Sequence, residues 1–299
     1  PDDHTTTDNF KSDVDFSGLS ILITGAAGTI GSGLTRRLLN SSFKQLILID
    51  NAESPLYYLK REVESKTNNK GVVFVLSDIR DEESMSQLFE TYSPTIVLHT
   101  AAYKHVSMME SNPYEAIKLN VLATKYLATL ALKHHVRKFL FVSTDKAVNP
   151  ASVMGMTKRI GELYLSSLNK LGNTKFLITR FGNIIGSNGS LLPSFDEQIK
   201  NGLPLTITSK KVTRYFIQKA KACELIMRIA YEENWKYSMF TFKMGEPIKI
   251  IDLAKIYLDF HSIEQKIKII GLKPGEKVHE GLFSFQRCCA NVVIMPKGP

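Results

Sequence analysis

Short apolar runs alternate with helical patterns along residues 19–180. The runs are rich in Val, Ile, Leu and Phe, as buried parallel strands are. They lie at 20–25, 46–50, 72–76, 95–100, 138–144 and 175–180. Amphipathic helical stretches fall between them, near 30–40, 53–66, 82–91, 113–134 and 154–171. This alternation predicts βαβ units with right-handed crossovers, and therefore an α/β fold with a doubly wound parallel sheet of the Rossmann type.

The texture of the chain changes after Arg180. Residues 181–195 and 201–206 are rich in Gly, Ser, Asn and Pro and are typical of ordered loops. We expect a smaller region here, placed over the carboxyl edge of the sheet. The expected domains are a tail or linker (1–16), a Rossmann domain (17–183, completed by about 217–245) and a mainly substrate-binding region (184–299).

Composition and charge narrow the function classes. The 299 residues carry 38 Lys and Arg against 29 Asp and Glu, a net charge of +9 spread along the chain. Without a basic helix stripe, this excess favours an anionic ligand such as a nucleotide phosphate, and we expect no nucleic-acid partner. Three cysteines and the absence of CxxC or HExxH predict a reducing, cytoplasmic location and no metal site. We also expect no membrane span in this segment, because it has no long apolar run.

A glycine-rich turn joins the first expected strand to the first expected helix. It reads Thr24-Gly25-Ala26-Ala27-Gly28-Thr29-Ile30-Gly31. Gly25 permits a tight turn, Gly28 lets the backbone approach a pyrophosphate, and Gly31 lets helix and strand pack closely. The helix start, with Thr29 and Ile30, offers free N–H groups to a phosphate. A bare turn before a helix is the alternative, but the strand–turn–helix context favours dinucleotide binding, which makes 17–183 the cofactor domain.

Two acidic positions follow the next strands. Asp50 ends the second strand and can accept both ribose hydroxyls of NAD, while it would repel the 2′-phosphate of NADP. Asp78 and Ile79 follow the third strand and are placed to meet the adenine. The alternative for Asp50 is an exposed strand end. The expected cofactor is therefore NAD.

The fifth strand ends in Ser143-Thr144-Asp145-Lys146, and a helix then carries Met154 and Lys158. Positions 154 and 158 share a helix face. This is the layout of short-chain dehydrogenases, in which Lys158 would hold the nicotinamide ribose and Tyr is usual at position 154. Because Met154 cannot move a proton, Asp145 and Lys146 are the candidate acid and base; an ion pair at a strand end is the alternative.

Eight motifs occur in one order: TGAAGTIGS (24–32), HTAAYKHVSMME (99–110), NVLAT (120–124), STDKAVNPASVMGMTKR (143–159), RFGNIIGSNGSLLPSF (180–195), TRYF (213–216), MGEPIKIIDLA (244–254) and GLKPGEKVHE (271–280). In this order they resemble the UDP-N-acetylglucosamine 4,6-dehydratases of the extended short-chain dehydrogenase/reductase family, the bacterial polysaccharide-biosynthesis proteins of the CapD, FlaA and PglF type. The resemblance covers about 18–282. It implies an extended Rossmann fold and, with Met at 154 and a start at Pro1, the excised cytosolic domain of a membrane-anchored protein of the inner membrane.

The resemblance also implies a reaction. The sugar is oxidised at C4, water is eliminated across C5 and C6, and the hydride returns to C6, so that NAD is regenerated. By position, Lys146 matches the base at C5, Asp145 matches the acid at C6, and Thr144 would hold the C4 hydroxyl. Ala101, Ala102, Lys104 and His105 would lie in the loop that passes the nicotinamide and substrate, where a solvated Lys104 is the alternative. Asn120 matches a helix residue that ties the catalytic strand in place.

The expected sugar-nucleotide side lies in the second region. The polar anchors of this region are Arg180, Asn183, Ser190 and Arg214, with Arg214 the candidate for the diphosphate. Glu276 and Lys277 are expected to close the pocket. Surface ion pairing is the alternative for each of these residues.

Three other functions remain open on the sequence: a C4 epimerase, which Met154 disfavours; a non-catalytic NAD-binding scaffold, which the intact Thr144–Lys146 and Lys158 disfavour; and nucleic-acid binding, already disfavoured. The resemblance further implies a homo-oligomer paired through 113–134 and 154–171. After Gly281 the chain departs from the family pattern.

Overall fold

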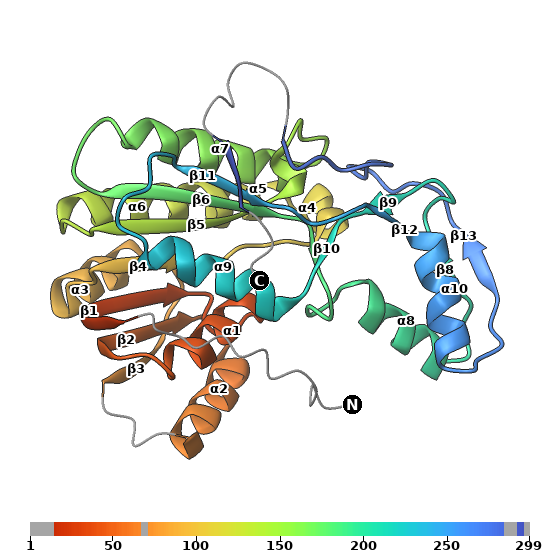
Figure 1. Ribbon diagram of the computed structural model, residues 1–299, viewed down its shortest axis with the longest axis horizontal. Coiled ribbons are helices and arrows are strands. Elements are labelled where there is room, and N and C mark those ends of the chain that lie inside the picture. Colours follow the sequence, from red (N-terminus) through yellow and green to blue (C-terminus); the bar gives the residue numbers. More distant parts are fainter. Residues whose placement is uncertain (1–14, 67–70, 284–291, 296–299) are drawn as a thin grey trace.

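The computed structural model describes residues 15–66 and 71–283 and the backbone of 292–295. Its centre is an eight-stranded sheet in the order β14-β11-β6-β5-β4-β1-β2-β3, in which every neighbouring pair is parallel (Figure 1). Six strands are those expected from the apolar runs: β1 (Phe16–Thr24), β2 (Phe43–Asp50), β3 (Val72–Leu76), β4 (Ile96–His99), β5 (Lys138–Thr144) and β6 (Lys175–Phe181). The predicted doubly wound α/β fold is therefore confirmed.

Helices cover both faces of the sheet. One face carries α1 (Thr29–Leu38), α2 (Glu53–Lys66) and α9 (Lys219–Tyr231). The other carries α3 (Glu82–Tyr92), α6 (Thr124–Lys133) and α7 (Val153–Leu168). Successive residues of a strand point to opposite faces, so Ile21 and Ile23 enter the first core while Leu22 enters the second. Both faces are apolar, which explains why the sequence shows continuous apolar runs.

Two chain segments extend the sheet beyond the expected strands. β1 begins at Phe16, the last residue of the range 1–16 that was expected to be a tail. The expectation was wrong at this residue, because the Phe16 ring is buried in the core against Tyr231 of α9. Residues 1–14 lie outside the described residues. At the other edge, β11 (Met239–Phe242) pairs with β6, and β14 (Val292–Met295) pairs with β11. The stretch after Gly281 therefore contributes a strand to the main sheet.

The stretch 113–134, expected as one helix, is helical throughout but not uniform. It consists of α5 (Pro113–Ile117), a π-helical segment η1 (Lys118–Ala123) and α6, and it follows the short helix α4 (Val106–Ser111). A π segment widens the helix by one residue per turn and often marks a functional position. Here it contains Asn120.

The remaining elements form a small lobe beyond the carboxyl ends of the strands (Figure 1). They are β7 (Asn183–Ile184), α8 (Leu191–Lys200), β8 (Leu205–Ile207), β9 (Thr213–Arg214), β10 (Phe216–Ile217), β12 (Ile248–Lys249), α10 (Ile250–Phe260) and β13 (Ile267–Ile269). Phe195, Leu205 and Leu258 belong to its separate core. The expected loop over 181–195 was wrong at both ends: β7 pairs with β10 near its start, and α8 begins at Leu191 with Phe195 buried in the lobe core. The expected loop over 201–206 was wrong from Leu205, where β8 pairs with β13.

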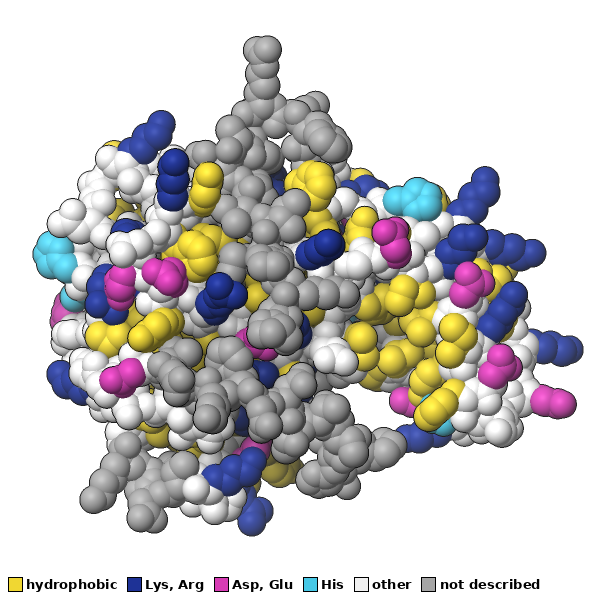
Figure 2. All heavy atoms as spheres, viewed as in Figure 1, with side chains coloured by type: hydrophobic (Ala, Val, Ile, Leu, Met, Phe, Trp, Pro, Cys, Tyr) yellow, Lys and Arg dark blue, Asp and Glu magenta, His cyan; other side chains and the backbone are white. Residues whose placement is uncertain are grey.

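Charged side chains are mixed on the face seen in Figure 2. Lys and Arg lie among Asp and Glu on both the sheet-containing part and the small lobe, and hydrophobic side chains gather over α10. Ile256 and Phe260 of α10 are among the exposed apolar residues. On this face the net positive charge is dispersed rather than gathered in one stripe.

Candidate active site

The glycine turn between β1 and α1 has no room for a side chain at Gly25 or Gly31. Gly25 has φ = +67°, and a Cβ on it would lie 2.8 Å from the Cα of Ala101. A Cβ on Gly31 would lie 2.2 Å from the carbonyl oxygen of Gly25. Gly28 is the N-cap of α1, and no side chain caps that end of the helix. The turn thus brings uncapped N–H groups to the mouth of the sheet, where they can bind an anion.

A cavity of about 590 Å³ lies along this edge of the sheet, within the usual size range of small-molecule sites. Most of the predicted site residues line it: Gly25, Gly28, Thr29, Ile30, Asp50, Asp78, Ile79, Ala101, Ala102, Lys104, His105, Thr144, Lys146, Met154, Lys158, Asn183 and Ser190. Gly31 packs beneath the turn, and Asp145 is fully buried behind it. Arg214 and Glu276 do not line the cavity; they lie farther out, at the small lobe.

The two acidic residues of the cofactor side differ in their partners. Asp50 Oδ2 accepts a hydrogen bond from the N–H of Ala27 (2.9 Å), which fixes its carboxylate against the glycine turn. Asp78 is held by Arg80 at 2.7 Å and by Asn51 at 3.0 Å. The hydrogen bonds from Arg80 lower the pKa of Asp78 to about 2. Asp78 is therefore an ionised, partnered carboxylate, and its contact with an adenine stays a prediction.

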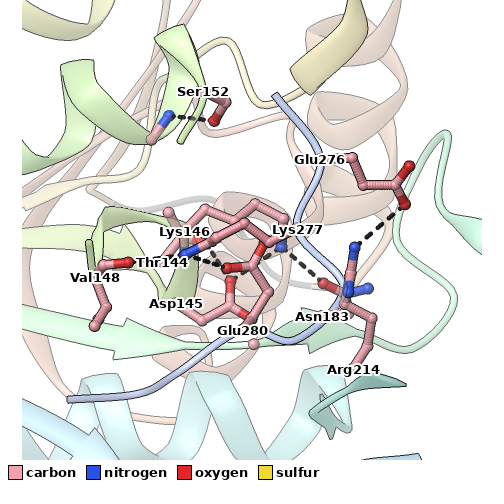
Figure 3. Close-up of polar contacts among 12 residues, drawn as sticks. Thr144, Asp145, Lys146, Val148, Ser152, Asn183, Arg214, Glu276, Lys277 and Glu280 are labelled. Carbon is pink, nitrogen blue, oxygen red and sulfur yellow. Dashed lines mark hydrogen bonds and ion pairs between the residues drawn. The ribbon is translucent and has the colours of Figure 1, made fainter. Parts of the chain in front are cut away.

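Asp145 and Lys146 form a 3-10 turn, η2 (Asp145–Ala147), directly after β5. Lys146 Nζ donates to Asp145 Oδ1 (3.0 Å) and to Asn183 Oδ1 (3.1 Å), and the Thr144 hydroxyl donates to Asp145 Oδ1 (2.9 Å) (Figure 3). The second carboxylate oxygen of Asp145 is buried without a hydrogen-bond partner. The Thr144 hydroxyl and the Lys146 amine thus share one oxygen atom of the Asp145 carboxylate. We call residues 144–147 the catalytic turn, after the roles predicted for them from the sequence.

Lys158 and Met154 face the same cavity from α7. Lys158 Nζ donates to the carbonyl of Val142 (2.9 Å) and lies 4.3 Å from the ring centre of Phe141. Burial lowers the pKa of Lys158 from 10.5 to about 7. Met154 is buried and packs with Met109 and Ala116, so position 154 presents a thioether where a short-chain dehydrogenase presents a phenol.

A buried ion pair supports the catalytic strand from below. Glu162 accepts hydrogen bonds from Arg180 Nε (2.6 Å) and Nη2 (2.5 Å) and from the Ser143 hydroxyl (2.7 Å). Glu162 is fully buried, and Arg180 is 1 % exposed. The expectation that Arg180 anchors the sugar nucleotide was wrong, because its guanidinium points into the core. Sequence reasoning missed Glu162, although its spacing of four from Lys158 places it on the same helix face.

The loops after β4 and β7 meet over the cavity. Lys104 Nζ donates to the carbonyl of Asn188 (2.6 Å), and the Asn188 N–H donates to the hydroxyl of Thr29 (3.3 Å). Gly189, at φ = +62°, lies so close to His105 that a Cβ would be 2.6 Å from the ring. Burial lowers the pKa of both Lys104 and His105. Lys104 is thus hydrogen-bonded to a loop that crosses the glycine turn, while the residue as a whole remains exposed. Its contact with substrate or cofactor stays a prediction.

Asn120 holds a loop and a helix, not the catalytic strand. Its Oδ1 accepts from the N–H of Tyr103 (2.9 Å), and its Nδ2 donates to the carbonyl of Tyr103 (3.0 Å) and the hydroxyl of Thr157 (3.1 Å). The expected role was therefore wrong in its target. The π segment directs Asn120 between the loop after β4 and α7, and so fixes both walls of the cavity.

The predicted diphosphate anchor is already paired within the protein. Arg214 Nη2 lies 3.3 Å from Glu276 Oε1, and Arg214 Nη1 donates to the carbonyls of Thr213 (2.7 Å) and Val278 (3.1 Å). Arg214 is buried at 6 % exposure. Ser190 begins α8 without a side-chain capping bond. The roles of these residues toward a sugar nucleotide stay predictions.

Two searches of the described ranges gave negative results. No group of three or more His, Cys, Asp or Glu in residues 15–66 and 71–283 could hold a metal ion. Within the same part of the chain, no helix has the length and apolarity to cross a membrane.

Known proteins are similar in sequence to this chain over most of its length. The family profile described as "Polysaccharide biosynthesis protein" matches residues 21–293. The chain is 40% identical over 272 residues to the probable polysaccharide biosynthesis protein EpsC of Bacillus subtilis, covering 89% of this chain and 45% of EpsC. It is 33% identical to a UDP-N-acetylglucosamine 4,6-dehydratase (inverting) of Campylobacter jejuni (90% of this chain, 78% of that one). It is 31% identical to a UDP-glucose 4-epimerase of Rickettsia rickettsii (90% and 79%). The chain therefore spans a little under half the length of EpsC.

Solved structures share the fold. The Thermus thermophilus UDP-glucose 4-epimerase in complex with NAD superposes with a TM-score of 0.76 at 22% identity, covering 89% of this chain and 90% of that one. The dTDP-glucose 4,6-dehydratase DesIV of Streptomyces venezuelae, also with NAD bound, gives 0.78 at 20% identity, with 88% of each chain covered. The fold is thus one on which NAD-bound epimerases and dehydratases are both built.

Proposed function

We propose that this chain, which belongs to the polysaccharide biosynthesis protein family, is an NAD-dependent 4,6-dehydratase of UDP-N-acetylglucosamine. Its membership confirms the resemblance carried by the eight motifs. Relatives include both dehydratases and epimerases of nucleotide sugars. The observation that favours dehydration is the catalytic turn, which holds a carboxylate and an amine 3.0 Å apart beside a methionine that cannot take up a proton.

The cavity residues fit NAD. The glycine turn leaves a cradle that a Cβ would fill, and α1 directs its uncapped start toward it. Asp50 supplies the acceptor for the ribose hydroxyls and disfavours a 2′-phosphate. Lys158 would hold the nicotinamide ribose. When bound, NAD would supply reversible hydride transfer, from sugar C4 at the start of the reaction and to sugar C6 at its end.

The residues of the catalytic turn divide the proton transfers. Thr144 binds the C4 hydroxyl and, with Asp145, takes its proton as C4 is oxidised. The new C4 ketone acidifies the C5 hydrogen, and Lys146 removes that proton. Asp145 protonates the C6 hydroxyl, which leaves as water. Lys146 then returns its proton to C5 as the hydride reaches C6, so the net change is the loss of one water.

This proposal is tested by incubating the protein with UDP-N-acetylglucosamine and NAD in D2O. Mass spectrometry should show the loss of one water, and proton NMR should show deuterium at C5. A product of unchanged mass would overturn the proposal, and a change of configuration at C4 in that product would identify an epimerase. Unchanged substrate with bound NAD would favour a non-catalytic scaffold.

Lys146→Ala tests the role of the base. This variant should keep NAD binding and lose both dehydration and the exchange of the C5 hydrogen. Lys255→Ala, which removes an exposed lysine of α10, is the matched control and should retain the activity of the unmodified protein. Full activity of Lys146→Ala would refute the assignment.

The epimerase is the second candidate, favoured by the relative from Rickettsia rickettsii. Both reactions exchange a proton with the C4 oxygen, for which position 154 offers no group and Thr144 with Asp145 would have to serve. An epimerase makes no use of an acid and a base at C6 and C5, which the catalytic turn would supply, and the mass of the product separates the two. We also propose that the protein works as a homo-oligomer through residues 113–134 and 154–171. Leu122 of η1 and Ile160 and Leu163 of α7 are each about half exposed. Its location as the cytosolic domain of a longer inner-membrane protein stays a prediction.

A further inference from the structure

Residues 273–280, which we call the bridging segment, run from the small lobe to the catalytic turn. On the lobe side, Glu276 Oε1 accepts from the hydroxyl of Thr208 (2.8 Å) and lies 3.3 Å from Arg214 Nη2. The carbonyl of Val278 accepts from the N–H of Thr213 (3.0 Å). This end of the segment is therefore fixed to β9 and to the loop after β8.

On the catalytic side, the bridging segment is fixed by Lys277. Its Nζ donates to the carbonyls of Val148 (2.9 Å) and Asn149 (3.3 Å) and lies 2.8 Å from Glu280 Oε2 (Figure 3). Val148 directly follows the catalytic turn and is bonded to it, because its N–H donates to the carbonyl of Asp145 (3.0 Å). Lys277 thus binds the backbone carbonyls that follow Asp145 and Lys146, the proposed acid and base.

The chain that Lys277 grips is irregular. Asn149 has φ = +45°, and Pro150 follows it, so no helix or strand holds this connection between η2 and α7. At its far end, Gly275 packs so closely that a Cβ would lie 2.8 Å from Ser152 and 2.6 Å from Glu110 Oε1, the oxygen that accepts from the N–H of Val153. The bridging segment therefore contacts the connection at both ends.

Lys277 brings its charge to a mostly buried place. Its side chain is 23 % exposed and that of Glu280 is 3 % exposed. A charged donor in such a place makes stronger hydrogen bonds than a neutral one, and Glu280 balances the charge. The arrangement costs the ordering of a long side chain, and what it orders is the backbone beside Asp145 and Lys146.

We propose that Lys277 is a positioning residue, which holds the catalytic turn in register for proton transfer at C5 and links that turn to the small lobe. This inference rests on the proposed dehydratase function for its catalytic readout. Lys277 does not line the cavity that we assign to the cofactor and sugar. Its effect on the reaction is exerted through the carbonyls of residues 148 and 149.

The test compares Lys277→Met, Lys277→Arg and Lys268→Met, where Lys268 is an exposed lysine on β13 and serves as the control. For Lys277→Met we expect kcat to fall by about tenfold or more, the loss of a charge-assisted hydrogen bond, with KM changed less than about threefold. The kinetic isotope effect on kcat with C5-deuterated substrate should rise, because a misplaced base makes C5 proton removal limiting. Lys277→Arg should restore part of kcat, and Lys268→Met should change nothing.

Folding is controlled by a second variant. Lys277→Met leaves the buried carboxylate of Glu280 unpaired, which itself can destabilise the protein. The double variant Lys277→Met with Glu280→Gln removes that charge. If the double variant is folded and recovers full kcat, Lys277 serves only to neutralise Glu280 and the proposal is overturned. If its kcat stays low and its isotope effect stays high, the positioning role stands.

Amide hydrogen exchange separates this proposal from the proposed function. In Lys277→Met, the Val148 amide should exchange faster than in the unmodified protein, while amides in the second half of α7 should not change. Unchanged exchange at residue 148 would overturn the positioning role. If the unmodified protein releases no water from its substrate, the dehydratase proposal fails, and the exchange result still decides whether Lys277 holds the turn.

Discussion

The buried pair of Glu162 and Arg180 offers the strongest test of how the catalytic strand is supported. The change is Glu162→Gln, which keeps the shape of the side chain and removes its charge. Glu162 then no longer offers a negative charge to Arg180, which is 1 % exposed, or to Arg159, whose Nη1 lies 3.1 Å from its Oε2. Breaking a buried pair by removing one partner costs about 3–5 kcal/mol, since it leaves an uncompensated charge. The total free energy of unfolding of a typical domain is only about 5–15 kcal/mol.

The assay is urea unfolding followed by tryptophan fluorescence. Trp235 is the only tryptophan. Its indole N–H donates to the carbonyl of Ile229 (3.0 Å), and its ring lies 4.7 Å from that of Phe240. Because these contacts belong to the core on the α9 face of the sheet, the emission of Trp235 reports global unfolding. We expect the midpoint to fall with little change in the slope of the transition.

A surface pair provides the matched control. Arg36 and Glu62 form a similar two-bonded pair at 2.7–2.8 Å, but their side chains are 39 % and 28 % exposed. Glu62→Gln should therefore cost less than about 1 kcal/mol. A loss for Glu162→Gln no larger than that of Glu62→Gln would refute the reasoning. Replacing both partners, with Glu162→Leu and Arg180→Leu, should recover most of the loss, because neither member of this pair then carries a charge.

Two further predictions concern α7. Between pH about 7 and 10.5, Lys158 is protonated in the unfolded chain and deprotonated in the folded protein. The free energy of unfolding of the cofactor-free protein should therefore rise with pH across that window, by roughly 5 kcal/mol at most. Urea unfolding at pH 7, 8 and 9 should show this rise, and an equal rise in Lys158→Met would contradict the assignment. Gly155→Ala should destabilise the protein by about 1–3 kcal/mol, although alanine favours helix by about 1 kcal/mol, because its Cβ would lie 2.3 Å from the carbonyl oxygen of Lys146. A raised unfolding midpoint would show that the catalytic turn yields to the added methyl group.

Six of the eight strands of the central sheet could be predicted, because most of them are buried on both faces. Such strands appear in the sequence as unbroken apolar runs, and the glycine turn and Asp50 lie at fixed places relative to them. The small lobe has no such signal. Its strands are two or three residues long, and its core depends on Phe195 and Leu258, which lie far apart in the chain.

Side-chain partners were predicted less well than positions. Arg180 has the residue type of a phosphate anchor, yet Glu162 draws it into the core from a helix 18 residues earlier. Asn120 points to Tyr103 and Thr157 because a π segment rotates it, and helical periodicity assumes a regular helix. Lys277 makes its contacts across about 130 residues of chain. None of these pairings follows from local spacing.

The path of the chain between the sheet and the small lobe has a consequence for how the molecule can be divided. The chain leaves the sheet after β6, returns for α9 and β11, leaves again for α10 and β13, and returns for β14. Neither part is one continuous stretch, so no single cut or truncation releases one part intact. Severing the chain anywhere between β6 and β14 separates strands of the same sheet. The two parts should accordingly melt in a single cooperative transition. A fragment ending at Phe181 lacks β11 and would leave the edge of β6 uncovered.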